Sequence, residues 1–155
     1  MTGEHTLGVI FADAVGRKLY IPRGAVSADT VRGTPATPPP AMVILSATDR
    51  KILAELPLSG ACDGAAFNPA TMDAFSTHGN GTMTIVKEVS PTKFEVLQNL
   101  NTMNGARTIA FDSKTGRFFV MSAERGPAPP PGAGGRQGQG AVIPGSFSIL
   151  MIGKP

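Results

Sequence analysis

Two charged residues and two histidines are the side chains in this sequence best suited to hold a ligand. Asp63 and Arg107 each stand immediately before one of two similar segments, so we expect them at equal depth in neighbouring units. There they could bind a charged ligand together or simply form an exposed ion pair. His5 and His78 could ligate a metal ion or a haem, but no carboxylate cluster accompanies them. The candidate ligand-binding residues are therefore Asp63, Arg107, His5 and His78, and the sequence predicts no metal site.

Other chemically suggestive residues have simpler structural explanations. Cys62 is the single cysteine, which excludes an intrachain disulfide, and we expect it to be a small buried residue. The Gly79-Asn80-Gly81 run lacks the lysine and helix that follow a phosphate-binding loop, and predicts a tight hairpin. The seven methionines are predicted to fill the core. No Ser-His-Asp or Cys-His arrangement is recognisable, so the sequence predicts no catalytic residue and no cofactor, and favours a non-enzymatic role.

A repeated pattern predicts the elements that position these residues. Three segments, 8–20, 64–76 and 108–120, align without gaps. Each has an aromatic residue, a polar turn and a second apolar residue eight positions on, which is typical of a strand, a tight turn and a strand. The aligned residues are Phe11, Phe67 and Phe111 at the first position, and Leu19, Phe75 and Phe119 at the second.

The second half of each unit predicts further strands. Segments 41–45, 82–86 and 146–150 align with Ile44, Ile85 and Ile149 in register, and a fourth strand follows at 51–56 and 93–97 in the first two units. A set of four antiparallel strands that recurs about every 40 to 55 residues is typical of β-propeller blades. An eleven-stranded sandwich or closed barrel is the alternative, but neither requires a threefold strand-turn-strand repeat.

The predicted fold class is therefore all-β, a partial β-propeller of about three four-stranded antiparallel blades. The chain of 155 residues is expected to be one domain. Its blades are expected at approximately 7–57, 63–99 and 106–153, and the last has only three strands.

Four segments resemble the C-terminal part of bacterial YVTN-repeat propeller proteins. They are residues 63–71, 79–86, 105–112 and 144–150, and the resemblance covers nearly the whole chain from Leu7. It implies a seven-bladed propeller that is usually exported to the periplasm or secreted, in most cases without an assigned enzymatic activity. This chain departs from that pattern because it has about half the blades and no apolar export signal at its start, so its localisation is left open.

Three blades alone cannot close a ring, which predicts a partner. An open stack leaves two apolar end faces and an unpaired strand edge in water. At about 25 cal/mol per Å² of apolar surface, two faces of several hundred Å² represent on the order of 10 kcal/mol. We therefore expect a head-to-tail homodimer with six blades, in which the partner's N-terminal residues supply the missing strand or the strand is absent. The alternatives are a fragment of a longer protein and a relic that only self-associates.

The loops indicate where a site would lie. In a blade, the loop between the second and third strands shares one face with the start of the first strand, at the mouth of the central channel. These loops are predicted at 23–40, 77–81 and 123–144, and the two long ones are rich in Pro and Gly. Such composition is typical of solvated insertions, or of a lid or arm that packs on a neighbouring subunit.

Charge and composition narrow the functional classes. The net charge is +3, but Lys and Arg are spread singly, which does not predict a nucleic-acid surface. No apolar run approaches the roughly 20 residues of a membrane-spanning helix. The sequence thus favours a non-catalytic propeller scaffold or binding module that self-associates to complete a ring. A ligand- or haem-binding or enzymatic domain, with an unknown small molecule or protein at the channel mouth, is the alternative.

Overall fold

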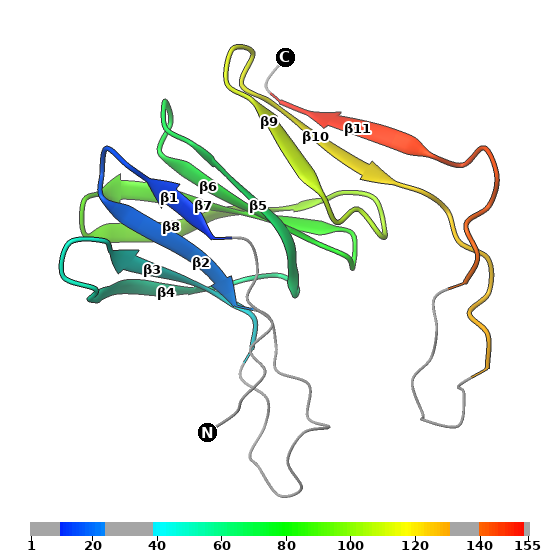
Figure 1. The fold of residues 1–155 in the computed structure, drawn as a ribbon, viewed down its shortest axis with the longest axis horizontal. Coiled ribbons are helices and arrows are strands. Elements are labelled where there is room, and N and C mark those ends of the chain that lie inside the picture. Colours follow the sequence, from blue (N-terminus) through cyan, green and yellow to red (C-terminus); the bar gives the residue numbers. More distant parts are fainter. Residues whose placement is uncertain (1–9, 24–38, 131–139, 154–155) are drawn as a thin grey trace, which may run out of the picture.

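The protein folds into three antiparallel β-sheets, described by a computed structural model for residues 10–23, 39–130 and 140–153 (Figure 1). The strands follow chain order within each sheet. The first sheet contains β1 (Phe11–Asp13), β2 (Lys18–Arg23), β3 (Ala41–Ser46) and β4 (Ile52–Pro57). The second contains β5 (Cys62–Asn68), β6 (Asp73–His78), β7 (Thr82–Ser90) and β8 (Lys93–Asn101). The third contains β9 (Ile109–Asp112), β10 (Arg117–Ser122) and β11 (Ser148–Ile152).

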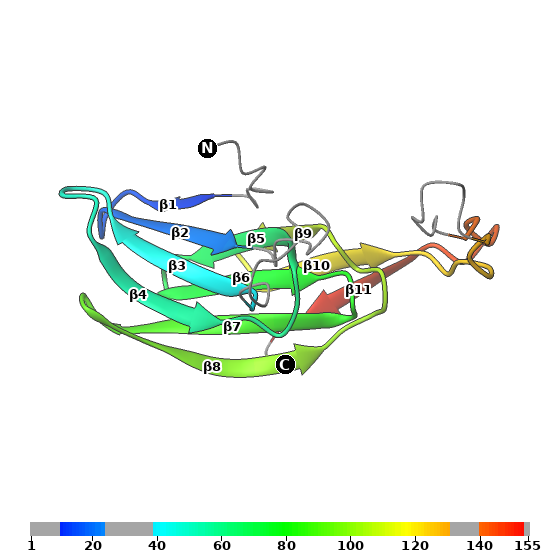
Figure 2. The same cartoon turned by 90° about the horizontal axis from the view of Figure 1, so that it is seen from below.

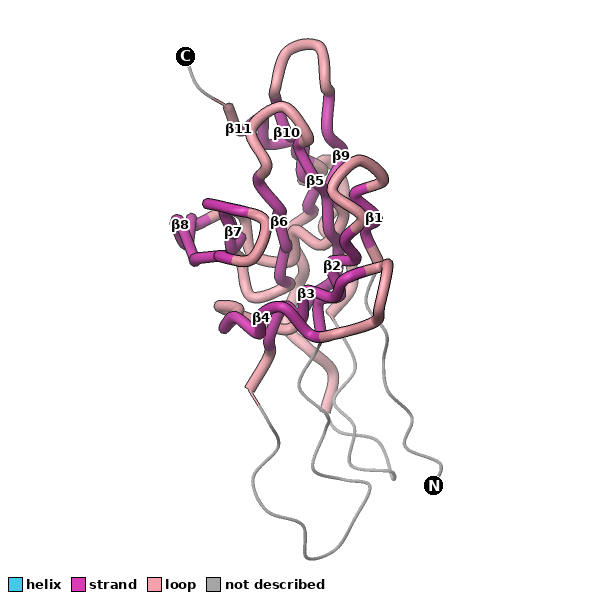
Figure 3. The backbone as a smooth tube through the Cα atoms, turned by 90° about the vertical axis from the view of Figure 1, so that its left-hand side faces the viewer, coloured by secondary structure: helices cyan, strands magenta, loops and turns pink. Residues whose placement is uncertain are grey.

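This arrangement confirms the all-β prediction and the count of four, four and three strands. The described residues form three separate sheets, and thus neither the two sheets of a sandwich nor one closed barrel. No described segment is a helix, as Figure 3 makes plain. The N-terminal residues expected to complete a partner's blade, and most of the loop at 23–40, lie outside the described residues.

Each sheet begins with the same hairpin, because each first strand ends in Asp or Asn. In Asx turns, these side chains accept a hydrogen bond from the backbone N–H two residues on. The bonds are Val15 N–H to Asp13 at 3.1 Å, Ala70 N–H to Asn68 at 3.0 Å and Lys114 N–H to Asp112 at 2.9 Å. The fourth residue after each is left-handed: φ is 51° at Arg17, 57° at Met72 and 69° at Gly116. The predicted polar turns are thus specified by short side chains that bond to the local backbone.

The register of these hairpins corrects the sequence alignment in the first unit by one residue. Asp13 pairs with Lys18 across the turn, as Asn68 pairs with Asp73 and Asp112 with Arg117. The structurally equivalent residues are therefore Ala12, Phe67 and Phe111 on the first strand, and Tyr20, Phe75 and Phe119 on the second. In the first unit, the ungapped alignment chose Phe11 and Leu19, each of which lies one residue before the structurally equivalent residue, Ala12 or Tyr20. A shift of one residue moves a strand side chain to the opposite face.

The third strand of the last unit is displaced by two residues from its predicted place. Ile44 pairs with Tyr20 and Ile85 with Phe75, whereas Phe119 pairs with Met151. Met151, and not Ile149, is therefore equivalent to Ile44 and Ile85. A shift of two residues keeps the same face of the strand, so the predicted alternation survives.

The second sheet lies between the other two and is covered on both faces. One core cluster joins it to the first sheet and includes Tyr20, Met42, Ile44, Phe67, Ala74, Val86 and Phe94. A second cluster joins it to the third sheet and includes Ala66, Phe75, Met83 and Phe118. Because both faces are covered, β6 is buried at every residue after its first.

The sheets stack with their first strands together. β1 lies beside β5, and β5 lies beside β9. At the opposite edge, β4 lies beside β8. Figure 2 shows β1, β5 and β9 along one side of the stack and β8 along the other. The starts of β5 and β9 therefore come close to each other, which matters for the site described below.

A buried ion pair fixes the first sheet to the second. Lys18 Nζ lies 2.8 Å from Glu88 Oε1, and each side chain is only 6% exposed. The hydroxyl of Tyr20 donates to Glu88 Oε2 at 2.8 Å. Burial and the neighbouring Glu88 carboxylate raise the pKa of Tyr20 well above its ordinary value, so the phenol stays protonated. One carboxylate thus satisfies two groups from the opposite sheet.

We predict that Glu88→Ala lowers the free energy of unfolding by about 3 to 5 kcal/mol, because it removes the carboxylate that pairs with the buried Lys18 ammonium. Tyr20→Phe removes only a hydroxyl and should cost about 1 kcal/mol. Both are measured by urea unfolding at one fixed protein concentration.

The exposed Lys51–Asp49 pair supplies the control. Its N···O distance is 3.0 Å, and the side chains are 78% and 45% exposed. Lys51→Ala should leave the unfolding midpoint near that of the wild type, since exposed pairs contribute little. Equal effects of Lys51→Ala and Glu88→Ala would contradict the role given to the buried pair.

Candidate functional site

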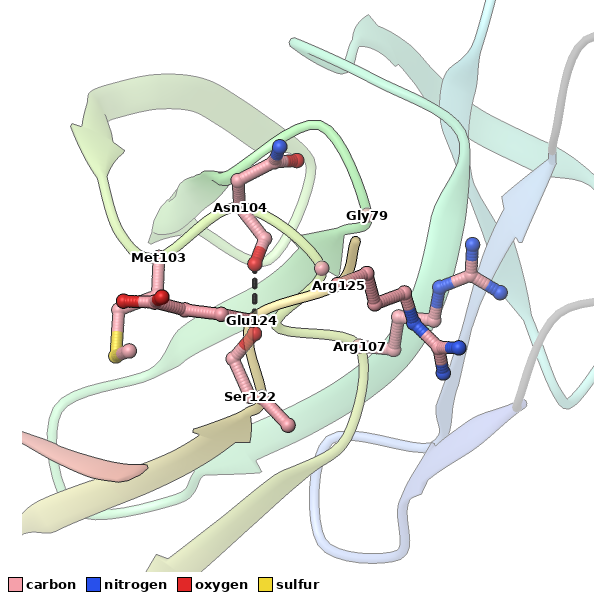
Figure 4. Close-up of a pocket in the computed structure, with 9 residues that line it drawn as sticks. Gly79, Met103, Asn104, Arg107, Ser122, Glu124 and Arg125 are labelled. Carbon is pink, nitrogen blue, oxygen red and sulfur yellow. Dashed lines mark hydrogen bonds between the residues drawn. The ribbon is translucent and has the colours of Figure 1, made fainter. Parts of the chain in front are cut away.

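A pocket of about 590 Å³ opens where the second and third sheets meet (Figure 4). Three connections form it: the turn between β6 and β7, the segment between β8 and β9, and the chain that leaves β10. The lining residues are Gly79, Met103, Asn104, Gly105, Arg107, Ser122, Ala123, Glu124 and Arg125. Two of these connections, after β6 and after β10, are the loops that the sequence analysis assigned to the face that carries a site.

Hydrogen bonds between the connections hold the walls of the pocket. The N–H of Gly105 donates to the carbonyl of Gly79 at 2.9 Å, which joins the β8–β9 segment to the β6–β7 turn. Ser122 Oγ donates to the carbonyl of Asn104 at 2.6 Å, which joins the end of β10 to the same segment (Figure 4). Gly105 has a φ of 78°, a conformation that side chains with a Cβ rarely adopt. Hydrogen bonds to the backbone of the three connections therefore define the shape of the cavity.

Gly64 in β5 allows the backbone of this strand to lie close to Arg107, which is two residues before the start of β9. A Cβ at Gly64 would lie 2.7 Å from the Arg107 carbonyl oxygen and 2.9 Å from Thr77 Oγ1. That hydroxyl donates to the same carbonyl at 2.7 Å. The backbone of Arg107 is thus clamped between β5 and β6, although its side chain is exposed.

The structure brings Asp63 and Arg107 to the same place, as the sequence analysis expected of equivalent positions. A Cβ at Gly79 would lie 2.9 Å from Asp63 Oδ2 and 3.2 Å from Arg107 Nε. Asp63 accepts a hydrogen bond from the N–H of Gly79 at 2.6 Å. None of the ion pairs found in the described part of the chain joins Asp63 to Arg107. Arg107 lines the pocket and Asp63 lies beside it, and their role in ligand binding stays a prediction.

His78 lies away from the pocket surface. It is the last residue of β6, not a turn residue, and it is fully buried. Nδ1 lies 3.0 Å from Thr82 Oγ1 and 3.2 Å from Ser59 Oγ, and Nε2 lies 3.0 Å from Ser76 Oγ. Both ring nitrogens therefore have hydroxyl partners inside the protein, a position that does not favour ligand binding. His5, the other candidate histidine, lies outside the described residues.

Burial lowers the pKa of His78 to about 4, although the negative charge of Asp63 acts in the opposite direction. The imidazole is therefore neutral at neutral pH, with one nitrogen available as an acceptor. Its hydroxyl partners belong to a larger network, because Ser59 Oγ also bonds to Thr82 and Thr84, each at 2.9 Å. His78 thus stabilises the end of β6 from which the Gly79 turn begins.

Cys62 is half-buried, and burial raises the pKa of its thiol above the ordinary value. The protonated thiol is a weak nucleophile, consistent with a packing role. Within the described ranges, no three residues of His, Cys, Asp or Glu are grouped so that they could hold a metal ion. The same ranges contain no helix long and apolar enough to cross a membrane.

Sequence reasoning missed most of the pocket. Asn104, Ser122 and Glu124 carry no motif, and Arg125 begins a Pro- and Gly-rich segment that the sequence analysis treated as an insertion. The one available signal was the position of Arg125 directly after a predicted second strand, on the face expected to carry the site. Its proximity to Arg107 follows from the β9–β10 hairpin, which pairs Ile109 with Val120 and so brings the residues before β9 close to those after β10.

No protein-family model and no curated protein matches the chain. Among solved structures, it is similar to a functionally unknown protein from Desulfotomaculum acetoxidans, with a TM-score of 0.39 and 11% sequence identity. The match covers 77% of this chain and 50% of the other, so this chain spans about half the length of that protein. The resemblance to YVTN-repeat propellers stays a prediction.

We predict that His78 makes the fold sensitive to acid. Below its ordinary pKa of 6.5, the unfolded chain binds a proton at this residue, whereas the folded chain does so only near pH 4. The free energy of unfolding should therefore fall as the pH falls through this window, by about 3 kcal/mol from this group. Urea unfolding of the wild type and His78→Gln at several pH values tests this. The variant should lose less stability across the window, and equal losses would contradict the assignment.

Proposed function

We propose that the chain is a three-blade β-propeller module that completes a six-bladed ring by stacking head-to-tail on a second copy, and that it serves as a non-catalytic binding module. One observation carries this proposal. The outer face of the third sheet exposes apolar side chains at register positions that the other two sheets bury.

Two cross-strand pairs form this outer face, Phe119 with Met151 and Met121 with Ile149. Met121, Ile149 and Met151 are 42%, 61% and 53% exposed. The equivalent pairs are Tyr20–Ile44 and Pro22–Met42 in the first sheet, and Phe75–Ile85 and Thr77–Met83 in the second. Tyr20, Met42, Phe75 and Met83 are at most 5% exposed, because they pack on the next sheet of the stack. The third sheet thus offers a next sheet the same type of surface.

The outer face of the first sheet has the complementary character. Its cross-strand pairs Leu19–Leu45 and Ile21–Val43 are apolar and only partly buried. The equivalents of the first pair are Ala74–Val86 and Phe118–Ile152, which pack against the preceding sheet. Stacking the third sheet of one copy on the first sheet of another would therefore repeat the interface that the chain makes twice internally.

The number of copies follows from ring geometry. Propellers typically close with about four to eight blades, and six is the one multiple of three in that range. A head-to-tail interface that closes on itself gives a cyclic dimer without exposed sheet faces. The pocket would then lie at the channel mouth, which supports a role in binding.

We predict that the protein is a dimer in solution, with about twice the 16.0 kDa mass of the chain by light scattering across a dilution series. Met151→Lys and Leu45→Lys should each open the ring, because each would bury an unpaired ammonium group in both of the ring's equivalent interfaces. An equimolar mixture of the two variants should still pair, since the intact third sheet of the Leu45→Lys chain can stack on the intact first sheet of the Met151→Lys chain.

Leu97→Lys is the matched control. Leu97 is 55% exposed on β8, away from both end faces, so this variant should have the mass of the wild type. A wild type that stays monomeric at high concentration would overturn the proposal. A dimer that Met151→Lys disrupts but Leu45→Lys leaves intact would indicate that two third sheets pair with each other.

A further inference from the structure

We propose that the pocket between the second and third sheets binds a small molecule through an oxyanion group, a carboxylate or phosphate, held by Arg107 and Arg125. All the residues that line the pocket belong to one chain, so this site does not require ring closure. Its volume of about 590 Å³ is typical of small-molecule pockets.

Arg107 supplies an anchored but unengaged cation. Its carbonyl accepts the hydrogen bond from Thr77, and Ala106 directly before it is fully buried. Its guanidinium group makes no hydrogen bond or ion pair within the described ranges. The Asp63 carboxylate and the Arg107 guanidinium group both lie close to Gly79, but Asp63 accepts the hydrogen bond of the Gly79 N–H. A guanidinium group carries five N–H donors in a planar fork, which suits the two oxygens of a carboxylate or phosphate.

Arg125 supplies a second cation from the chain that leaves β10. Its Nη1 donates to the carbonyl of Gly140 at 3.0 Å, and its backbone forms a β-bridge with Val142. These bonds hold the residue at the rim of the pocket and leave other guanidinium donors available. In Figure 4, the guanidinium groups of Arg107 and Arg125 extend to the same side of the pocket.

The acidic side chain of the pocket lies elsewhere. Glu124 extends toward Met103 in Figure 4, on the side opposite to the two arginines. The cationic side is therefore not neutralised by the carboxylate of Glu124. The hydrogen bonds of Gly105 and Ser122 hold the walls before a ligand arrives, which lowers the entropic cost of binding.

Two arginines in a formed cavity favour an oxyanion over an apolar or cationic ligand. Guanidinium groups bind carboxylates and phosphates by two parallel N–H···O bonds, which adds orientation to charge attraction. Lys at the same positions would attract the anion as a point charge without this geometry. This difference allows charge and geometry to be tested separately.

The test is titration of the full chain with inorganic phosphate and, separately, with succinate, followed by amide chemical shifts. We expect saturable shifts at Gly79, Gly105 and Ser122 with at least one probe. Binding to phosphate only would indicate a phosphate ligand, and binding to succinate only a carboxylate ligand. Arg107→Gln and Arg125→Gln should each weaken binding by about tenfold or more, since each removes charged hydrogen bonds.

Two further variants keep the test decisive. Arg107→Lys preserves the charge and should bind more weakly than the wild type but more tightly than Arg107→Gln. Arg50→Gln removes an exposed arginine in the β3–β4 turn and should bind as the wild type does. The proposal is overturned by the absence of saturable shifts with both probes, or by unchanged affinity in the two glutamine variants of the pocket.

Discussion

The structure depends on the burial of the second sheet on both faces. A four-stranded sheet has little stability alone, so each sheet here gains its core from its neighbours. This constraint explains why β6 does not alternate between buried and exposed residues. Phe75 faces the third sheet while Ala74 faces the first, and both are buried. Stacking thus decides which faces of the first and third sheets must be apolar.

Stacking on both faces also buries polar groups, and a buried polar group without a hydrogen-bond partner is costly. Glu88 satisfies Lys18 and Tyr20 across one sheet interface. His78 is satisfied by hydroxyl groups of its own sheet and of Ser59. The Glu88 contacts restrict how the first and second sheets can slide, whereas the His78 contacts hold the end of β6. Because β6 ends at His78, the same network fixes the turn at Gly79 and one wall of the pocket.

The two proposals rest on different parts of the stack. Self-association rests on the end faces, where the third sheet repeats apolar positions that the first two sheets bury. Oxyanion binding rests on the interface between the second and third sheets, where Arg107 and Arg125 meet from different connections. A stack of sheets provides both, because the faces of the sheets hold the stack together while the connecting loops are free to vary.

The sequence by itself determined the strands, the turns and their grouping into four, four and three. These features depend on alternation and on bonds between residues a few positions apart, such as those of Asp13, Asn68 and Asp112. Only the tertiary structure decided the burial of His78 and the joining of the Gly79 turn to the β8–β9 segment in one pocket. Each of these depends on which sheet faces cover one another, and residues far apart in the chain set that packing.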